Sequence, residues 1–154
     1  MDKLCLDLNG LHEYQQNRYP YLLIDVAEEV IPGKSAKGYK NLTVDDWWFE
    51  VHFPGDPNMP GALQMEAMVQ LGALMVTTLP GNKGKVVYLT SANLNLINKV
   101  IPGDCLEIET ELLSWKRGIG KCSAAGYVKE EKVCSLDYNI VMPHILSDYR
   151  VSKK

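Results

Sequence analysis

Several features are scarce or absent in this 154-residue sequence, and each absence excludes a class of protein. Basic residues are not in excess. Sixteen Lys and Arg stand against nineteen Asp and Glu, and the formal net charge of −3 argues against nucleic acid as the main partner. No run approaches the ~18 consecutive apolar residues that a membrane-spanning helix needs. The first residues lack the basic stretch and the long apolar run of a secretory signal, so we expect a cytoplasmic protein with no transmembrane segment.

Metal and redox motifs are also missing. The four cysteines, at positions 5, 105, 122 and 134, form no C-x-x-C pair and have no histidine at zinc-finger spacing. We therefore predict no metal site and interpret these residues as reduced, mostly buried thiols. No repeat, low-complexity tract or linker divides the chain, and a hydrophobic content of 46% is typical of one globular unit. The sequence thus predicts a single domain over residues 1–154.

One segment, residues 62–78, is strongly apolar. It is too short to cross a bilayer and apolar on most sides, so it is predicted to be a helix buried within its own fold. Residues 4–17 are compatible with a short helix or an arm, and we expect the polar tail 143–154 to fray. Turn signals separate the strands predicted on both sides of the helix, at 21–26, 36–44, 46–53, 85–91, 93–100, 104–115, 119–129 and 132–142. This order predicts an α+β domain whose antiparallel sheet wraps the helix.

The buried helix contains one charged residue, Glu66. A carboxylate is costly to desolvate, so in apolar surroundings it has a raised pKa, a hydrogen-bonded partner, or both. Gln70 lies one turn later, where its amide can reach the carboxylate. The alternative is that Glu66 faces water near the start of the helix, where a negative charge favours the helix dipole.

His52 stands directly before a loop rich in proline and glycine. Histidine exchanges protons near neutral pH, and among His12, His52 and His144 this one is the best placed to act as a general base. A lone histidine beside a turn is more often a structural residue. The order of features favours chemistry, because a base, a loop, a helix start at Gly61 with free N–H groups and then the acid Glu66 follow one another.

A long motif carries a specific family resemblance. The run His52-Phe-Pro-Gly-Asp-Pro-Asn-Met-Pro-Gly61, followed by Glu66-Ala-Met-Val-Gln70, resembles the signature of the hotdog-fold 3-hydroxyacyl-(acyl carrier protein) dehydratases, the FabZ/FabA type. The similarity extends through Arg18-Tyr-Pro-Tyr-Leu-Leu-Ile-Asp25, Pro102-Gly-Asp104 and Arg117-Gly-Ile-Gly-Lys121. It covers about residues 17–142 and implies a hotdog fold, with the antiparallel sheet wrapped around a long central helix.

The resemblance also implies a reaction and roles for four residues. The reaction is the reversible dehydration of 3-hydroxyacyl thioesters to trans-2-enoyl thioesters, in fatty acid synthesis or a related lipid or polyketide-like pathway. His52 would be the base and Glu66 the acid, brought together across a dimer interface. The Gly61 N–H would bind the thioester carbonyl, and Gln70 would orient the acid. No cofactor is implied. The expected partners are an acyl carrier protein and a second copy of the chain, with a hexamer of three dimers as a further option.

The sequence departs from the family pattern at several positions. Asn58 replaces the usual valine in the histidine loop, and Gln16-Asn17 replaces the usual proline-histidine. Both changes bear on acyl-chain preference and carrier docking more than on the chemistry. The side chains of Trp47, Trp48 and Met68 are candidates to line an acyl tunnel, with core packing as the alternative. Basic residues that could attract an acidic carrier, or simply be solvated, are Lys83, Lys85, Lys116, Arg117 and Lys121.

Two other functions remain compatible with the same pattern. A hotdog acyl thioesterase would use the same fold to hydrolyse the thioester and release a free thiol. A non-catalytic acyl-carrier or lipid-binding module would need the pocket but not the pair His52 and Glu66, so the presence of both favours an enzyme.

Overall fold

A computed structural model describes residues 2–146 of the chain. The described part contains seven strands and three principal helices. In chain order they are β1 (Leu4–Leu6), α1 (Leu8–Tyr14), β2 (Val26–Ile31), β3 (Ser35–Asn41), α2 (Trp48–Val51), α3 (Gly61–Thr77), β4 (Tyr88–Leu96), β5 (Cys105–Lys116), β6 (Ile119–Val128) and β7 (Glu131–Val141). Residues 143–146 are also helical, while the rest of the tail predicted to fray lies outside the described residues.

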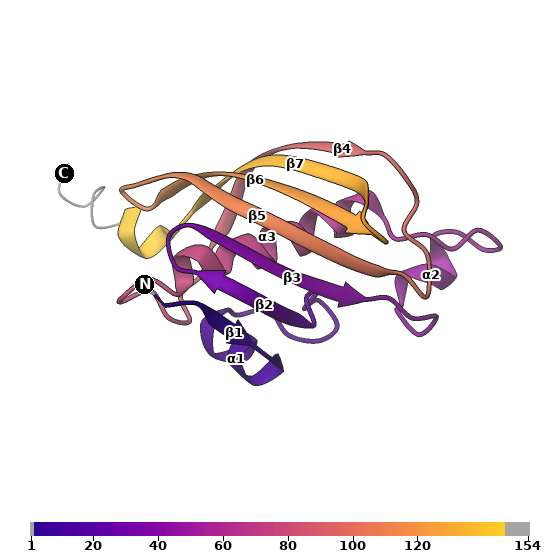
Figure 1. The fold of residues 1–154 in the computed structure, drawn as a ribbon, viewed down its shortest axis with the longest axis horizontal. Coiled ribbons are helices and arrows are strands. Elements are labelled where there is room, and N and C mark those ends of the chain that lie inside the picture. Colours follow the sequence, from indigo (N-terminus) through magenta and orange to yellow (C-terminus); the bar gives the residue numbers. More distant parts are fainter. Residues whose placement is uncertain (1, 147–154) are drawn as a thin grey trace.

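The strands form one antiparallel sheet in the order β1-β2-β3-β5-β6-β7-β4, and the sheet curves around α3 (Figure 1). Inward-facing residues of β5 alternate with exposed ones, as expected for a sheet with one face on the core and the other in water. The α+β class and the sheet wrapped around a central helix, predicted from the order of elements, are confirmed.

Helix α3 begins at Gly61 and ends at Thr77, within one residue of the predicted segment. Thirteen of its seventeen residues are buried, which explains why it shows so little amphipathic contrast in the sequence. Pro60 caps its start, with its carbonyl accepting hydrogen bonds from Leu63 N (2.9 Å) and Gln64 N (3.0 Å). The helix therefore holds both the core and the single acidic side chain Glu66.

The strand predicted at 21–26 is wrong. Leu23 and Ile24 are both buried, but this segment is irregular, and the strand β2 starts only at Val26. At Tyr21 and Leu23 the backbone pairs with a side chain instead of a neighbouring strand: Leu23 N donates to Gln70 Oε1 (2.7 Å) and Tyr21 O accepts from Gln70 Nε2 (2.7 Å). A side-chain amide thus satisfies the backbone groups that a sheet ladder would otherwise satisfy.

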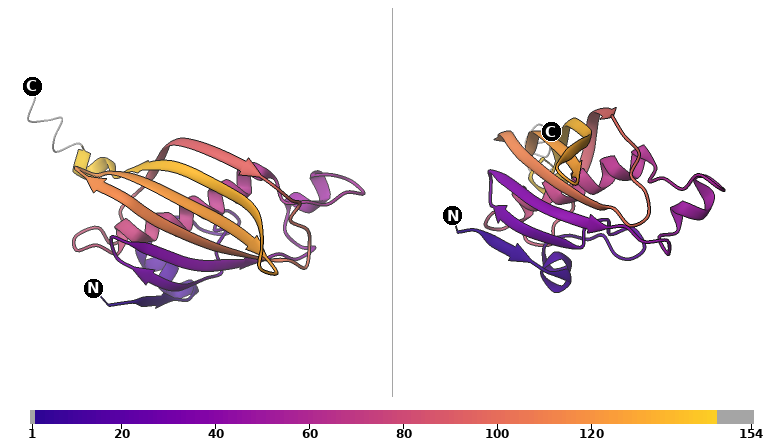
Figure 2. Two further views of the ribbon diagram at one scale, coloured as in Figure 1. Left: turned by 45° about the horizontal axis from the view of Figure 1, so that its top comes forward. Right: turned by 45° about the vertical axis from the view of Figure 1, so that its right-hand side comes forward.

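The aromatic strand predicted at 46–53 is also wrong, because this segment contains the short helix α2. A turn precedes it, in which Thr43 N donates to Asp46 Oδ2 (2.9 Å) and Phe49 N donates to Asp46 O (3.2 Å). The neighbouring side chains of Trp48 and Phe49 are both buried, whereas a strand would point them to opposite faces. In Figures 1 and 2, α2 and the loop that follows project from one end of the molecule.

The segments predicted as separate strands at 85–91 and 93–100 are a single strand, β4, with an irregularity between Leu89 and Ser91. It pairs with β7 on one side only and forms an edge of the sheet. Most of its residues are exposed, including Tyr88 and Leu96 at its two ends. A long exposed edge strand is a ready surface for pairing with another chain.

Candidate active site

The acidic half of the candidate site lies on α3. Glu66 is partly buried, and burial raises the pKa of its carboxyl above the ordinary value. Gln70 Nε2 donates a hydrogen bond of 3.0 Å to Glu66 Oε1, as the spacing of four residues predicts, and this bond partly offsets the rise of the pKa. The predicted raised pKa and the predicted partner are therefore both confirmed, and the alternative of a fully solvated carboxylate is excluded.

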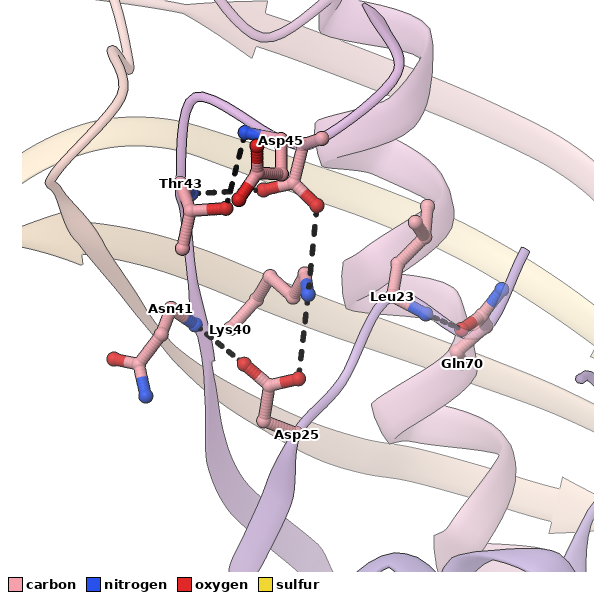
Figure 3. A network of polar contacts seen from close by, with 8 residues as sticks. Leu23, Asp25, Lys40, Asn41, Thr43, Asp45 and Gln70 are labelled. Carbon is pink, nitrogen blue, oxygen red and sulfur yellow. Dashed lines mark hydrogen bonds and ion pairs between the residues drawn. The ribbon is translucent and has the colours of Figure 1, made fainter. Parts of the chain in front are cut away.

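Gln70 is itself held rigidly. Its side chain is 5% exposed, and besides Glu66 it contacts the backbone of Tyr21 and Leu23 from the irregular segment described above. Figure 3 shows the bond between Leu23 and Gln70 beside the ion pairs of Lys40. A buried amide with these three partners has one orientation, so its N–H is fixed toward the carboxyl group of Glu66.

The basic half lies at the end of α2, where His52 follows the last helical residue. His52 Nδ1 lies 3.0 Å from the backbone carbonyl oxygen of Asn58. A carbonyl oxygen only accepts hydrogen bonds, so Nδ1 carries the proton and Nε2 of the neutral ring is left as the basic atom. This contact involves the backbone of position 58 and not its side chain, which donates to Asp56 O (3.0 Å).

The loop between His52 and α3 is stabilised by its own turns. Phe53 and Asp56 exchange two backbone hydrogen bonds of 2.9 Å, and Gly55 between them has φ +78°, a conformation that favours glycine. Asn58 N donates to His52 O (3.0 Å), and Lys99 Nζ lies 2.8 Å from Asp56 Oδ1. The proline- and glycine-rich sequence thus fixes the carbonyl that holds the histidine.

Gly61 opens α3 next to this loop. Leu63 N and Gln64 N already bond to Pro60, and within residues 2–146 the Gly61 N–H has no acceptor. A Cβ at Gly61 would overlap the end of the exposed Leu96 side chain, which would have to shift to make room for it. A free N–H at the positive end of a helix dipole is suited to bind a carbonyl oxygen that gains negative charge.

The site is split within one chain. His52, Asn58 and Gly61 line one pocket, together with residues 96–99, whereas Glu66 and Gln70 line another. The single chain therefore brings together His52 with Gly61, and Glu66 with Gln70, but does not place the base and the acid in a common cavity.

The remaining sequence candidates have mixed outcomes. Trp48 and Met68 are fully buried core residues, while Trp47 is about half exposed at 51%. Among the basic residues, Lys83 Nζ is paired with Glu13 Oε2 at 2.7 Å and lies over the ring of Tyr14.

The prediction of mostly buried thiols holds for only part of the set. Cys122 and Cys134 are buried, Cys105 is intermediate and Cys5 is exposed.

Two structural findings concern the wider surroundings of the site. Over residues 2–146, no three His, Cys, Asp or Glu side chains converge as metal ligands would. No helix in that same range is long and apolar enough to cross a membrane.

The sequence interpretation missed Thr77 and the segment 15–17, which share the pocket of Glu66. A signal for Thr77 was present, because Glu66, Gln70, Ala73 and Thr77 follow the i, i+4, i+7, i+11 spacing of one helix stripe. The departure from the family pattern at Gln16-Asn17 pointed to acyl-chain preference, but nothing in the sequence indicated that residues 15–17, distant along the chain, share a pocket with Glu66.

Comparison with known proteins places the chain among dehydratases. Residues 16–137 match the model of the FabA-like domain. The chain is 44% identical over 124 residues to the 3-hydroxyacyl-[acyl-carrier-protein] dehydratase FabZ of Clostridium novyi, covering 79% of this chain and 87% of that protein. It is also 44% identical over 129 residues to the FabZ of Caldicellulosiruptor saccharolyticus, covering 83% and 92% of the two proteins.

Solved structures share the fold at lower identity. The dehydratase heterocomplex ApeI:P from Xenorhabdus doucetiae matches with a TM-score of 0.75 at 14% identity, covering 94% of this chain and 97% of that one. A hypothetical thioesterase from Streptococcus pneumoniae, solved with coenzyme A, matches with a TM-score of 0.56 at 14% identity, covering 73% and 80%. The same fold therefore occurs in proteins described as dehydratases and as thioesterases, and the fold alone does not separate the two activities.

Proposed function

This chain belongs to the FabA-like family and is a FabZ-type 3-hydroxyacyl-(acyl carrier protein) dehydratase of fatty acid biosynthesis, and we propose that His52 and Glu66 are its catalytic pair. The observation that carries these roles is the hydrogen bond between His52 Nδ1 and Asn58 O. It leaves Nε2 as a free base in the pocket that Gly61 also lines, while burial keeps Glu66 suited to hold a proton.

The chemistry follows from these positions. His52 Nε2 takes the proton from C2 of the 3-hydroxyacyl thioester, and the electron pair moves toward the carbonyl oxygen at C1. The Gly61 N–H and the dipole of α3 stabilise the charge that develops there. The C2–C3 double bond then forms as the C3–O bond breaks, and Glu66 gives its proton to the departing hydroxyl, which leaves as water. A proton passed back from His52 to Glu66 restores the starting state.

The split of the site between two pockets supports a homodimer as the functional unit. His52 directly follows α2, which projects from one end of the molecule (Figures 1 and 2), and its neighbours Val51 (65%) and Phe53 (51%) are exposed apolar residues. The edge strand β4 is exposed along most of its length. A second copy of the chain would cover these apolar side chains and pair with the free edge of β4. The Glu66 of that second copy would then complete the pocket of His52.

The first experiment tests the reaction. The protein is incubated with a short trans-2-enoyl thioester, and hydration is followed as loss of the conjugated enoyl absorbance. We expect activity in the wild type and a loss of about 10²–10⁴-fold in His52→Ala and in Glu66→Gln. His12→Ala is a matched control, because His12 lies within α1 and lines neither pocket, and it should keep full activity. Release of free thiol without hydration would instead identify a thioesterase.

A second experiment tests the shared site. Co-expressed His52→Ala and Glu66→Gln chains should regain about a quarter of wild-type activity, because half of the dimers would be mixed and each mixed dimer has one intact site. No regain above the two separate variants would contradict a site built from two chains. Measurement of the mass in solution would distinguish a dimer from a hexamer of three dimers.

A further inference from the structure

The pocket behind Glu66 runs along one stripe of α3. Val69, Gln70, Ala73 and Thr77 follow Glu66 on this stripe, and they line the pocket together with residues 15–17 and 85–87. Thr77 lies eleven positions after Glu66, which corresponds to about 16 Å at the ~1.5 Å rise of an α-helix. The residues that line the pocket therefore reach from the acid to the C-terminal end of the helix, where Thr77 lies beneath the pocket surface.

The proposed chemistry fixes what enters this pocket. Gly61 and His52 act at C1 and C2 of the acyl group, and Glu66 acts at C3, so the rest of the acyl chain continues from C3 past Glu66. Gln16 Nε2 donates to Gly84 O and thereby links the two segments that form the opposite wall. The walls combine polar and apolar side chains in similar measure, whereas a pocket for a plain alkyl chain is expected to be mostly apolar.

The far end contains an unusual group. Thr77 is 0% exposed, and its hydroxyl has no hydrogen-bond partner within residues 2–146. Such a buried hydroxyl is costly unless something bonds to it. Its neighbour Thr78 differs, because the Thr78 hydroxyl donates to Leu74 O at 2.6 Å and does not line the pocket.

We propose that this pocket selects acyl chains that carry a hydroxyl or keto oxygen far from the thioester, and that the Thr77 hydroxyl binds that oxygen. A hydroxyl can both donate and accept, so it fits either group. An alkyl end would leave Thr77 unpaired, and sites built around a hydrogen bond discriminate strongly against analogues that lack it. Position 77 is thus a specificity-determining residue. This inference rests on the proposed function, because it needs the reacting carbons to lie at Glu66.

The test compares two series of trans-2-enoyl thioesters of graded length, one with alkyl ends and one with a terminal hydroxyl. Where the chain is long enough to reach Thr77, the wild type should prefer the hydroxylated substrate by about tenfold or more in kcat/KM. Thr77→Val should abolish or reverse this preference, Thr77→Ser should retain it, and the matched control Thr78→Val should leave it unchanged.

The outcomes separate the two proposals. A thioester too short to reach Thr77 should be hydrated by the wild type, and failure of the wild type on it would contradict the catalytic assignment. If that short substrate reacts while the wild type prefers alkyl ends, or while Thr77→Val keeps the wild-type ratio, the specificity proposal is overturned and the catalytic assignment stands. Thermal unfolding shows whether Thr77→Val still folds normally. We expect no loss of stability, because the substitution removes an unpaired buried hydroxyl.

Discussion

Gln70 donates a hydrogen bond of 3.0 Å to Glu66 one helical turn before it, and the same amide bonds to the backbone of Tyr21 and Leu23. One buried side chain therefore joins the acid on α3 to an irregular segment that is distant in sequence. The position serves both the orientation of the carboxyl group and the packing of residues 21–25 on the helix.

Replacing Gln70 with Leu should lower both stability and activity. Leu23 N would be left unpaired in a buried place, at a cost of about 1–3 kcal/mol in the free energy of unfolding, and the partly buried Tyr21 O would lose its partner as well. The Gln70 hydrogen bond lowers the pKa of Glu66, so its loss should raise that pKa further. Because the proposed mechanism uses protonated Glu66, the alkaline limb of the pH–rate profile should move to higher pH. A limb that stays in place or moves to lower pH would contradict the assignment of Glu66 as the acid.

Replacing Glu66 with Gln should change how stability depends on pH. Burial raises the pKa of this carboxyl in the folded state, so its favourable contribution is fully present below the unfolded-state pKa and is lost as pH rises through the folded-state pKa. The glutamine variant has no proton to lose. We therefore expect its stability relative to wild type to improve as pH is raised from about 5 to about 8, as measured by denaturant unfolding.

The matched control for this comparison is Glu111→Gln, since Glu111 is exposed on β5. Its stability relative to wild type should not improve with pH in the same way. Equal pH dependence of the two variants would show that burial of Glu66 has no energetic consequence.

Replacing Asn58 with Val should leave turnover within about threefold of wild type, because a backbone carbonyl and not this side chain holds His52 Nδ1. The side chain makes one hydrogen bond, to Asp56 O, in an exposed loop, and such bonds contribute little. The hydration assay measures the effect. A loss of activity near that of His52→Ala would show that the loop needs the amide to keep the carbonyl in place.

The candidate site could be predicted from the sequence to a large extent, and parts of the fold could not. Glu66, Gln70 and the helix that holds them follow from local rules, because helix spacing and the cost of burying charge are both properties of a short segment. The segments 21–26 and 46–53 were predicted as strands because their residues favour strands. Their actual structure depends on partners that the local pattern does not contain, the Gln70 amide in one case and the burial of adjacent aromatic residues in the other.

Gly72 provides a final prediction about the core. A Cβ at this helix position would overlap the hydroxyl of Tyr138, which is buried and bonded to Thr110 Oγ1 at 2.6 Å. Alanine gains about 1 kcal/mol over glycine in helix propensity, but overpacking a well-filled core costs about 1–3 kcal/mol, so Gly72→Ala should be destabilising on balance. Removing the hydroxyl with Tyr138→Phe relieves the closest contact, and the double variant should therefore be more stable than the sum of the two single effects. Denaturant unfolding of all four proteins gives this coupling directly, and strict additivity would show that the helix moves away from the sheet instead of colliding with Tyr138.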